Sequence, residues 1–206
     1  MVRLITIERE YGSGGSEIAQ KVAERFNWKL WDQALTAEIA RLLDCPSRTV
    51  EEHEERRDSL HYRLFKSFMR GSFEGSLNAP RLKLVDADCI REVTQQVVLG
   101  AAREGNAVIV GRGSAYYLRD LADAFHVFVY APFEEKVRRL RLRGKSESDA
   151  AELADTVDRE RSEYIKKYFH VEWPSREYFH LMINTVVGDE AVAETIAHAV
   201  TGAHGA

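Results

Sequence analysis

The sequence is poor in the features that mark secreted, membrane and nucleic-acid-binding proteins. Its two cysteines, Cys45 and Cys89, form no C-x-x-C pair, which argues against a disulfide framework and a zinc knuckle. No apolar run approaches the roughly 18 residues that suggest a membrane span. The net charge of −4 argues against a general nucleic-acid binder. The chain starts directly with a strand-like segment and no signal peptide, so we expect a cytoplasmic protein that binds neither nucleic acid nor membrane.

The sequence also lacks the groupings of several catalytic classes. Its seven histidines show no metal-ligand spacing, and no Ser/His/Asp or Cys/His arrangement suggests nucleophilic catalysis. The length of 206 residues is enough for one substantial core and at most two small domains. We expect a single domain over residues 1–206.

Residues 4–19 have the pattern of a strand, a glycine-rich loop and a helix. An apolar run ends before Gly12-Ser13-Gly14-Gly15-Ser16, and apolar residues at helical spacing follow from Ile18. Such a loop points backbone N–H groups at one place, at the positive end of a helix dipole, where a phosphate binds. A plain tight turn is the alternative, but it rarely needs three glycines and two serines in five residues.

The loop lacks the lysine of the usual phosphate-loop motif, G-x-x-x-x-G-K-[ST]. Aligned on Gly14 and Ser16, the chain has Arg9 in place of the first glycine and Gly15 in place of the lysine. That lysine normally reaches the outer phosphates of the nucleotide.

Four further strand-like segments alternate with segments of helical spacing. The strands are expected at 29–32, 107–110, 125–130 and 179–184, and the helices at 36–43, 90–103, from Pro132 onward, at 158–167 after a short restart at 146–154, and at 190–200. This alternation predicts an α/β fold with a five-stranded parallel sheet flanked by helices. Ligands of such sheets bind at the carboxyl ends of the strands.

Two charged residues stand at expected strand ends. Asp32 either faces a substrate or caps the helix that follows it, and the sequence does not choose between these roles. Arg112 lies between Gly111 and Gly113 after an expected buried strand, and we expect it to face the same crevice as the glycine-rich loop. Because its planar fork suits a phosphate, we favour a ligand role for Arg112 over a structural ion pair.

Two later charged groups and one long excursion remain open in the sequence. A positive cluster after strand 125–130 is either a solvated helix face or a lid over a polyphosphate; it comprises Lys136, Arg138, Arg139, Arg141, Arg143 and Lys145. Asp158 and Arg161 have the spacing of a helical ion pair. Residues 44–88 read as a helical excursion with a mobile loop, which would either cover a substrate or join two copies of the chain in a homo-oligomer.

Two stretches resemble the cytidylate kinase-like proteins, a branch of the nucleoside monophosphate kinases. They are Ile-Thr-Ile-Glu-Arg-Glu-Tyr-Gly-Ser-Gly-Gly-Ser-Glu-Ile-Ala, which opens the chain, and Val110-Gly111-Arg112-Gly113 with the segment 121–132 that follows. The resemblance runs from about residue 2 to residue 200 and is weak over 44–88. It implies a three-layer P-loop kinase-like fold with a helical insertion at 44–88 and an arginine-rich lid at 138–165. It also implies transfer of the γ-phosphoryl group of ATP, with Mg2+, to a nucleoside monophosphate, first of all CMP or dCMP.

The resemblance also implies a role for each candidate residue. The donor phosphates would be cradled by Gly12, Ser13, Gly14 and Gly15, with the Ser16 hydroxyl on Mg2+. The acceptor phosphate would be held by Arg112 with the help of Arg161, while Asp158 orients the nucleotide or Arg161. The lid would supply Arg139 and Arg143, and Asp32 would lie by the acceptor sugar or the waters of the metal.

Three positions depart from the pattern of cytidylate kinases: Gly15 replaces the lysine, Val110 replaces an acidic residue and Gly113 replaces an aspartate. The cytidylate kinase-like branch tends to share the lysine-free loop. Losing one preorganised cation costs on the order of 3–4 kcal/mol of transition-state stabilisation, and we hypothesise that Arg9 or a lid arginine replaces it. The alternatives are a nucleotide-binding regulatory protein without phosphoryl transfer, a kinase for a different small metabolite, and an interaction domain that uses residues 44–88.

Overall fold

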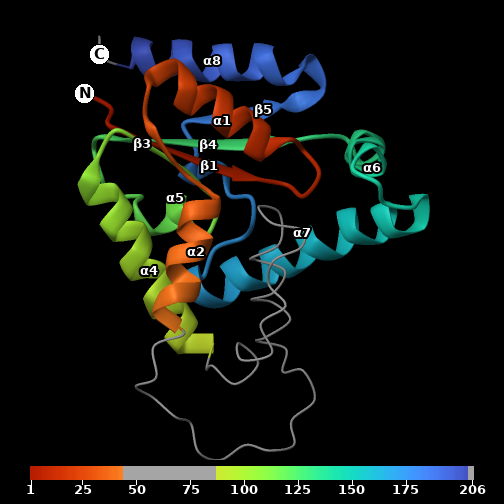
Figure 1. Cartoon of the computed structure of the whole chain (residues 1–206), viewed down its shortest axis with the longest axis horizontal. Helices are drawn as coiled ribbons and strands as arrows, with labels where there is room; N and C mark the ends of the chain where they lie inside the picture. Colours follow the sequence, from red (N-terminus) through yellow and green to blue (C-terminus); the bar gives the residue numbers. More distant parts are fainter. Residues whose placement is uncertain (44–86, 204–206) are drawn as a thin grey trace, which may run out of the picture.

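Five parallel strands form the central sheet of the computed structural model, which describes residues 1–43 and 87–203 (Figure 1). The strand order is β2-β3-β1-β4-β5, and every neighbouring pair is parallel. The strands are β1 (Leu4–Arg9), β2 (Lys29–Trp31), β3 (Ala107–Val110), β4 (Ala124–Tyr130) and β5 (Leu181–Asn184). The five-stranded parallel sheet expected from the sequence is confirmed.

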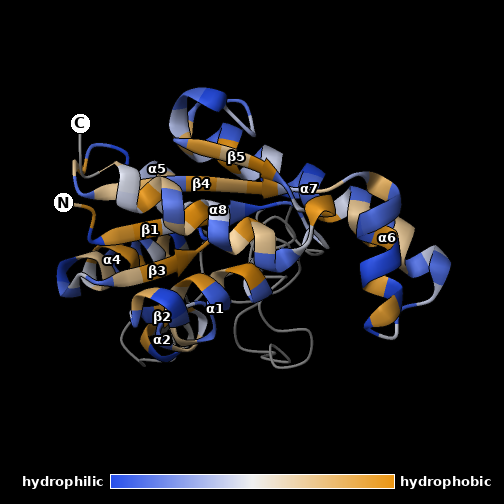
Figure 2. Cartoon of the chain, turned by 90° about the horizontal axis from the view of Figure 1, so that it is seen from above, coloured by the Kyte–Doolittle hydropathy of each residue, from blue (hydrophilic) through white to orange (hydrophobic). Residues whose placement is uncertain are grey.

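Helices cover both faces of the sheet, so the fold has three layers (Figures 1 and 2). On one face, α1 (Gly15–Phe26) and α8 (Asp189–Gly202) pack against the apolar side chains of β1, β3 and β4. The other face is covered by α2 (Gln33–Leu43), α4 (Ala87–Glu104), the short α5 (Ser114–Tyr117) and α7 (Glu147–Phe169). Burial on both faces explains why β3 and β4 read as nearly continuous apolar runs.

The register of the sheet brings the end of β1 next to the turn after β3. Ile7 of β1 is opposite Val110, the last residue of β3. Glu8 and Arg9 therefore extend past the end of β3, and they pair only with Phe128 and Val129 of β4. Two charged side chains thus stand at the carboxyl edge of the sheet, where α/β proteins bind ligands.

The C-terminal half differs from the sequence expectation in one respect. The sequence predicts a short connection with a helix restart at 146–154 and a separate helix at 158–167. The structure has the single helix α7 (Glu147–Phe169) instead, and the Ser146 hydroxyl at its N-terminus accepts a hydrogen bond from the Asp149 N–H. The buried positions of α7 recur every three or four residues from Ala150 to Ile165, which is the period of one continuous amphipathic helix. The shorter α6 (Phe133–Leu142) precedes it and carries the positive cluster as far as Arg141, while Arg143 and Lys145 follow its last residue.

The excursion expected at 44–88 lies outside the described residues except for its last two positions, which belong to α4. Within the described part of the chain, no helix is both long enough and apolar enough to cross a membrane.

We expect Ile7→Ala to destabilise the fold strongly. Ile7 is fully buried and immediately precedes the charged end of β1, and truncation of such a core isoleucine costs about 2–5 kcal/mol. Urea denaturation of the wild type and the variant measures the difference. Leu142→Ala is the control, because Leu142 is 75% exposed and its truncation should change the free energy of unfolding by no more than about 0.5 kcal/mol. Equal losses in the two variants would contradict the packing described here.

Candidate active site

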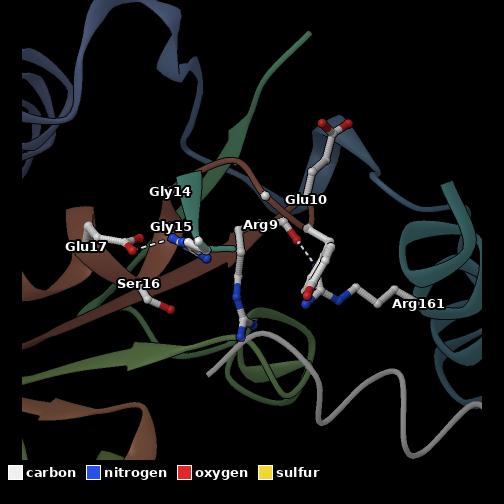
Figure 3. Close-up of a pocket in the computed structure, with 10 residues that line it drawn as sticks. Arg9, Glu10, Gly14, Gly15, Ser16, Glu17 and Arg161 are labelled. Atoms are coloured by element: carbon white, nitrogen blue, oxygen red, sulfur yellow. Dashed lines mark hydrogen bonds and ion pairs between the residues drawn. The ribbon is translucent and has the colours of Figure 1, made fainter. Parts of the chain in front are cut away.

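The glycine-rich loop lies between the end of β1 and the start of α1 and borders a pocket (Figure 3). Gly12 and Gly14 have φ angles of 81° and 88°, in the left-handed region that favours glycine. The lining comprises Arg9, Glu10, Tyr11, Gly12, Gly14, Gly15, Ser16, Glu17, Arg143 and Arg161. Ser13 is fully buried and donates a hydrogen bond to the Glu10 carbonyl oxygen at 2.8 Å, so it shapes the loop from inside.

Three buried arginines converge on this edge of the sheet: Arg9 from β1, Arg112 from the turn after β3 and Arg161 from α7. Arg161 Nη1 donates to the Arg9 carbonyl oxygen at 2.9 Å. Burial, followed by repulsion from Arg9, lowers the pKa of Arg112 to about 9 and the pKa of Arg161 to about 10. The protein environment thus disfavours the cationic forms of Arg112 and Arg161 relative to water. An anion placed among the arginines would offset both the loss of hydration and the repulsion between them.

Two buried carboxylates face this arginine cluster (Arg9, Arg112 and Arg161). Desolvation raises the pKa of Glu8, although all three arginines oppose the shift. Asp32 is also buried, and its attraction acts on Arg112 more weakly than the repulsion from Arg9. Asp32 Oδ1 has no hydrogen-bond partner among the residues that the structure describes. That oxygen is thus a candidate to contact a ligand or a metal-bound water.

The backbone holds Arg112 in an unusual conformation. Gly111, Arg112 and Gly113 have φ angles of 64°, 60° and 65°, and such left-handed backbone is uncommon for a long side chain. Arg112 Nη2 donates to Thr36 Oγ1 at 2.7 Å, and Thr36 Oγ1 donates to the Asp32 carbonyl oxygen at 3.3 Å. The turn after β3 and the first turns of α2 together fix the guanidinium.

Asp158 connects the loop to two later helices. Its Oδ1 accepts from the Tyr11 backbone N–H at 2.7 Å, and its Oδ2 accepts from Lys136 Nζ at 2.9 Å. Lys136 Nζ also lies 3.2 Å from Glu10 Oε2, and Arg161 Nη1 lies 3.4 Å from Asp158 Oδ1. The ion pair expected between Asp158 and Arg161 is therefore present, and it belongs to a network that anchors the start of the loop.

The two lid arginines differ in their surroundings. Arg143 lines the pocket and bonds to Glu17 of α1. Arg139 is held between Glu135 and Asp189, at 2.8 Å from each, and its guanidinium packs against Gly14. Hydrogen bonds from Arg138 and Arg139 lower the pKa of Glu135 to about 2. Only Arg143 of this pair contributes to the pocket as described.

Three residues that matter to this geometry were not singled out from the sequence, namely Glu8, Glu10 and Thr36, and Lys136 was named only as one member of the positive cluster. Glu8 left a signal, because a charged residue in a buried strand needs partners. The signal for Thr36 is weaker: it follows Asp32 by four residues, so the first turn of the expected helix would bring the two close together. The sequence contains no signal that separates Glu10 and Lys136 from their charged neighbours.

The residues present fit Mg2+ bound together with a nucleotide. The described part of the chain holds no group of three or more His, Cys, Asp or Glu side chains suited to a metal. Magnesium is usually held by one or two protein oxygens, substrate phosphates and water, so such a group is not required. Ser16 lines the pocket in the first turn of α1, and Asp32 Oδ1 is a second available oxygen.

Comparisons with known proteins identify the family of the chain and support its fold. The model of the cytidylate kinase-like family matches residues 4–186. A crystal structure of an uncharacterized protein from Eubacterium ventriosum is similar over 98% of this chain and 99% of its own, with 22% identity and a TM-score of 0.68. Shikimate kinase from Acinetobacter baumannii, in complex with shikimate, is similar over 98% of this chain and 94% of its own, with 14% identity and a TM-score of 0.55. A search of the curated proteins finds none that matches.

We expect Asp158→Ala to loosen the loop and to destabilise the fold by about 3 kcal/mol, because it leaves buried charges without their partner. Urea denaturation measures the stability, and amide hydrogen exchange at Tyr11 measures the loop. Asp158→Asn should restore slow exchange at Tyr11, since an amide oxygen still accepts that hydrogen bond.

The control for this prediction is Asp155→Ala on the same helix. Asp155 pairs with Arg159 and both side chains are largely exposed, so its loss should change the stability by less than about 1 kcal/mol. Unchanged exchange at Tyr11 in Asp158→Ala would show that the Asp158 network does not hold the loop.

Proposed function

Because this chain belongs to the cytidylate kinase-like family, we propose that it is a cytoplasmic kinase that transfers the γ-phosphoryl group of ATP to a nucleoside monophosphate. CMP and dCMP are the first acceptors to consider, since the family name points to them. The observation that carries the proposal is the arginine cluster between the glycine-rich loop and the turn at Gly111–Gly113. Phosphoryl transfer requires in-line positioning and cations around the transferred group, and this arrangement supports both.

The donor half of the site is assigned to the loop. Gly12, Ser13, Gly14 and Gly15 would present backbone N–H groups to the phosphates of ATP at the N-terminus of α1. Ser16 would hold Mg2+, which when bound neutralises charge on the donor phosphates. Arg139 and Arg143 are proposed as lid arginines, and the position of Arg143 at the pocket supports its part directly.

The acceptor half is assigned to the opposite side of the cluster. Arg112 would hold the acceptor phosphate with its fork, supported by Arg161, which Asp158 orients. Asp32 would lie near the acceptor sugar or the metal waters. In the reaction an acceptor oxygen forms a bond to the γ-phosphorus while the bond to the bridging oxygen of ATP breaks, and ADP leaves with that electron pair.

Two other functions remain as alternatives. A kinase for a different small metabolite is the first, because an arginine fork accepts a carboxylate as readily as a phosphate. A nucleotide-binding regulatory protein is the second, because Val110 supplies no carboxylate to a metal and the loop has no lysine. An interaction domain built on 44–88 would use residues that lie largely outside the described part of the chain.

A coupled ADP-release assay with ATP and Mg2+ tests the proposal. We expect turnover with at least one of CMP, dCMP, UMP, AMP and GMP, and a loss of kcat/KM of at least about tenfold in Arg112→Ala, because a lost bond to a charged group is worth roughly 1.5–3 kcal/mol. Arg119→Ala is the control, since this exposed arginine precedes β4 at the other end of the strand.

The outcomes of this assay separate the three functions. Silence with every nucleotide but turnover with small hydroxy acids would favour the metabolite kinase. Silence throughout, with ATP still raising the melting temperature, would favour the regulatory protein. Equal activity of Arg112→Ala and the wild type would remove Arg112 from the acceptor site.

Thr36→Val should raise the KM for the acceptor by about tenfold and leave the KM for ATP within about twofold. The variant keeps the side-chain shape but removes the acceptor of the Arg112 hydrogen bond, a loss of about 1.5 kcal/mol. Thr195→Val serves as the matched control, because the Thr195 hydroxyl donates to the Ala191 carbonyl oxygen on the exposed face of α8. An equal rise in both KM values would mean that Thr36 supports the whole site and not Arg112 specifically.

A further inference from the structure

The backbone conformation at position 15 does not require a glycine. Gly12 and Gly14 of the same loop have positive φ angles, whereas Gly15 does not. A side chain at this position would therefore meet no conformational penalty. The reason must lie in the space around Gly15.

The stem of Arg9 occupies the space that a side chain at position 15 would need. A Cβ atom built on Gly15 would lie 2.7 Å from Arg9 Cβ and 2.8 Å from Arg9 Cγ, closer than real carbon atoms pack. Arg9 is itself only 5% exposed, so its stem has little room to withdraw. A lysine at position 15 and an arginine at position 9 thus exclude each other.

The other end of Arg9 reaches the turn after β3. A Cβ atom on Gly111 would overlap Arg9 Nη1 and lie 2.7 Å from Arg9 Cζ. The guanidinium therefore rests against Gly111, next to Arg112. In Figure 3 the side chain runs past Gly15, between Ser16 on one side and Arg161 on the other. Arg9 thus spans the gap between the donor loop and the proposed acceptor turn.

The other arginines near the loop have different surroundings. Arg139 and Arg143 are held by carboxylates of α6, α8 and α1. Arg161 is bound to the Arg9 carbonyl oxygen and Arg112 to Thr36. Arg9 lines the pocket together with Arg143 and Arg161. Among these five arginines, Arg9 is the one that starts from the strand that leads into the loop.

We propose that Arg9 is the phosphate-loop cation of this protein, moved from the first turn of α1 to the end of β1, with Gly15 and Gly111 as the two positions that make room for it. The inference rests on the proposed phosphoryl transfer for its catalytic part. It unites two departures from the motif, Arg9 for glycine and Gly15 for lysine, into one exchange.

The new position changes what the cation can do. A lysine is a point charge, whereas the planar guanidinium can donate to two phosphate oxygens at once. Arg9 lies beside Gly111, where the transferred group would pass from donor to acceptor. It would donate N–H bonds to the equatorial oxygens of that group. We therefore expect it to act more on kcat than on the KM for ATP.

Exchange variants test this directly in the full-length protein. Arg9→Met keeps most of the stem and should lower kcat by about 10²- to 10³-fold, the range for one lost preorganised donor, with the KM for ATP changed less than tenfold. Gly15→Lys alone should also lose at least tenfold in kcat, because the lysine displaces Arg9. The double variant Arg9→Gly/Gly15→Lys should exceed Arg9→Gly by at least tenfold, since it restores the usual arrangement. Arg25→Met, on the exposed face of α1, is the control.

Calorimetric binding of inorganic tripolyphosphate gives a second readout that needs no turnover. Arg9→Met should weaken it at least tenfold, and the double variant should recover it, with folding checked by the melting temperature. If the wild type binds tripolyphosphate in this Arg9-dependent way but turns over no acceptor, the proposed phosphoryl transfer is contradicted. The assignment of Arg9 as the phosphate-loop cation would still be supported. Unchanged binding and kcat in Arg9→Met, no tripolyphosphate binding by the wild type, or a fully active Gly15→Lys would each overturn the exchange.

Discussion

Buried positive charge at the carboxyl end of β1 is the constraint on which this site depends. Arg9, Arg112 and Arg161 are almost fully removed from water, and the repulsion from Arg9 adds to the desolvation of the other two. Buried cations persist only where anions and hydrogen bonds offset the cost. Glu8 and Asp32 offset part of that cost, which gives a reason for a glutamate directly after the apolar Ile7 of β1. The fold thus holds the cations in place before any phosphate arrives, which is the preorganisation that phosphoryl transfer uses.

The same electrostatics couples the loop to the helices that follow β4. Asp158 of α7 accepts from the Tyr11 N–H, and Lys136 of α6 bonds to both Asp158 and Glu10. The first residues of the loop are therefore held by two helices far away in sequence. Since α6 and α7 carry the proposed lid, a shift of these helices would act on the loop through Asp158 as well as through Arg143.

Local periodicity was enough to predict the fold, because each strand and helix carries its own apolar pattern, and the resemblance supplied its family. The two glycines beside Arg112 at a strand end singled this arginine out as a candidate, and the structure places it in the buried arginine cluster. Local periodicity could not separate Arg139 from Arg143, which lie one helical turn apart and share the same signal. Their difference depends on Asp189 and Glu17, which only the folded chain brings near. The role of Lys136 could not be predicted for the same reason, because its partners Asp158 and Glu10 come near only in the folded chain.

The lysine-free loop shows how two sequence departures can be one structural change. In the sequence alone, Arg9 is a charge without an explanation and Gly15 marks the absence of the usual lysine. Considered separately, the two departures suggest that phosphoryl transfer has been lost. In the folded protein both positions share one volume, because the Arg9 stem lies where a side chain at Gly15 would be. The number of cations at the loop is then conserved, while the direction from which one of them enters has changed. A motif records which residues stand at which positions, whereas catalysis depends on which charges reach the phosphates, and these can be preserved by different sequences.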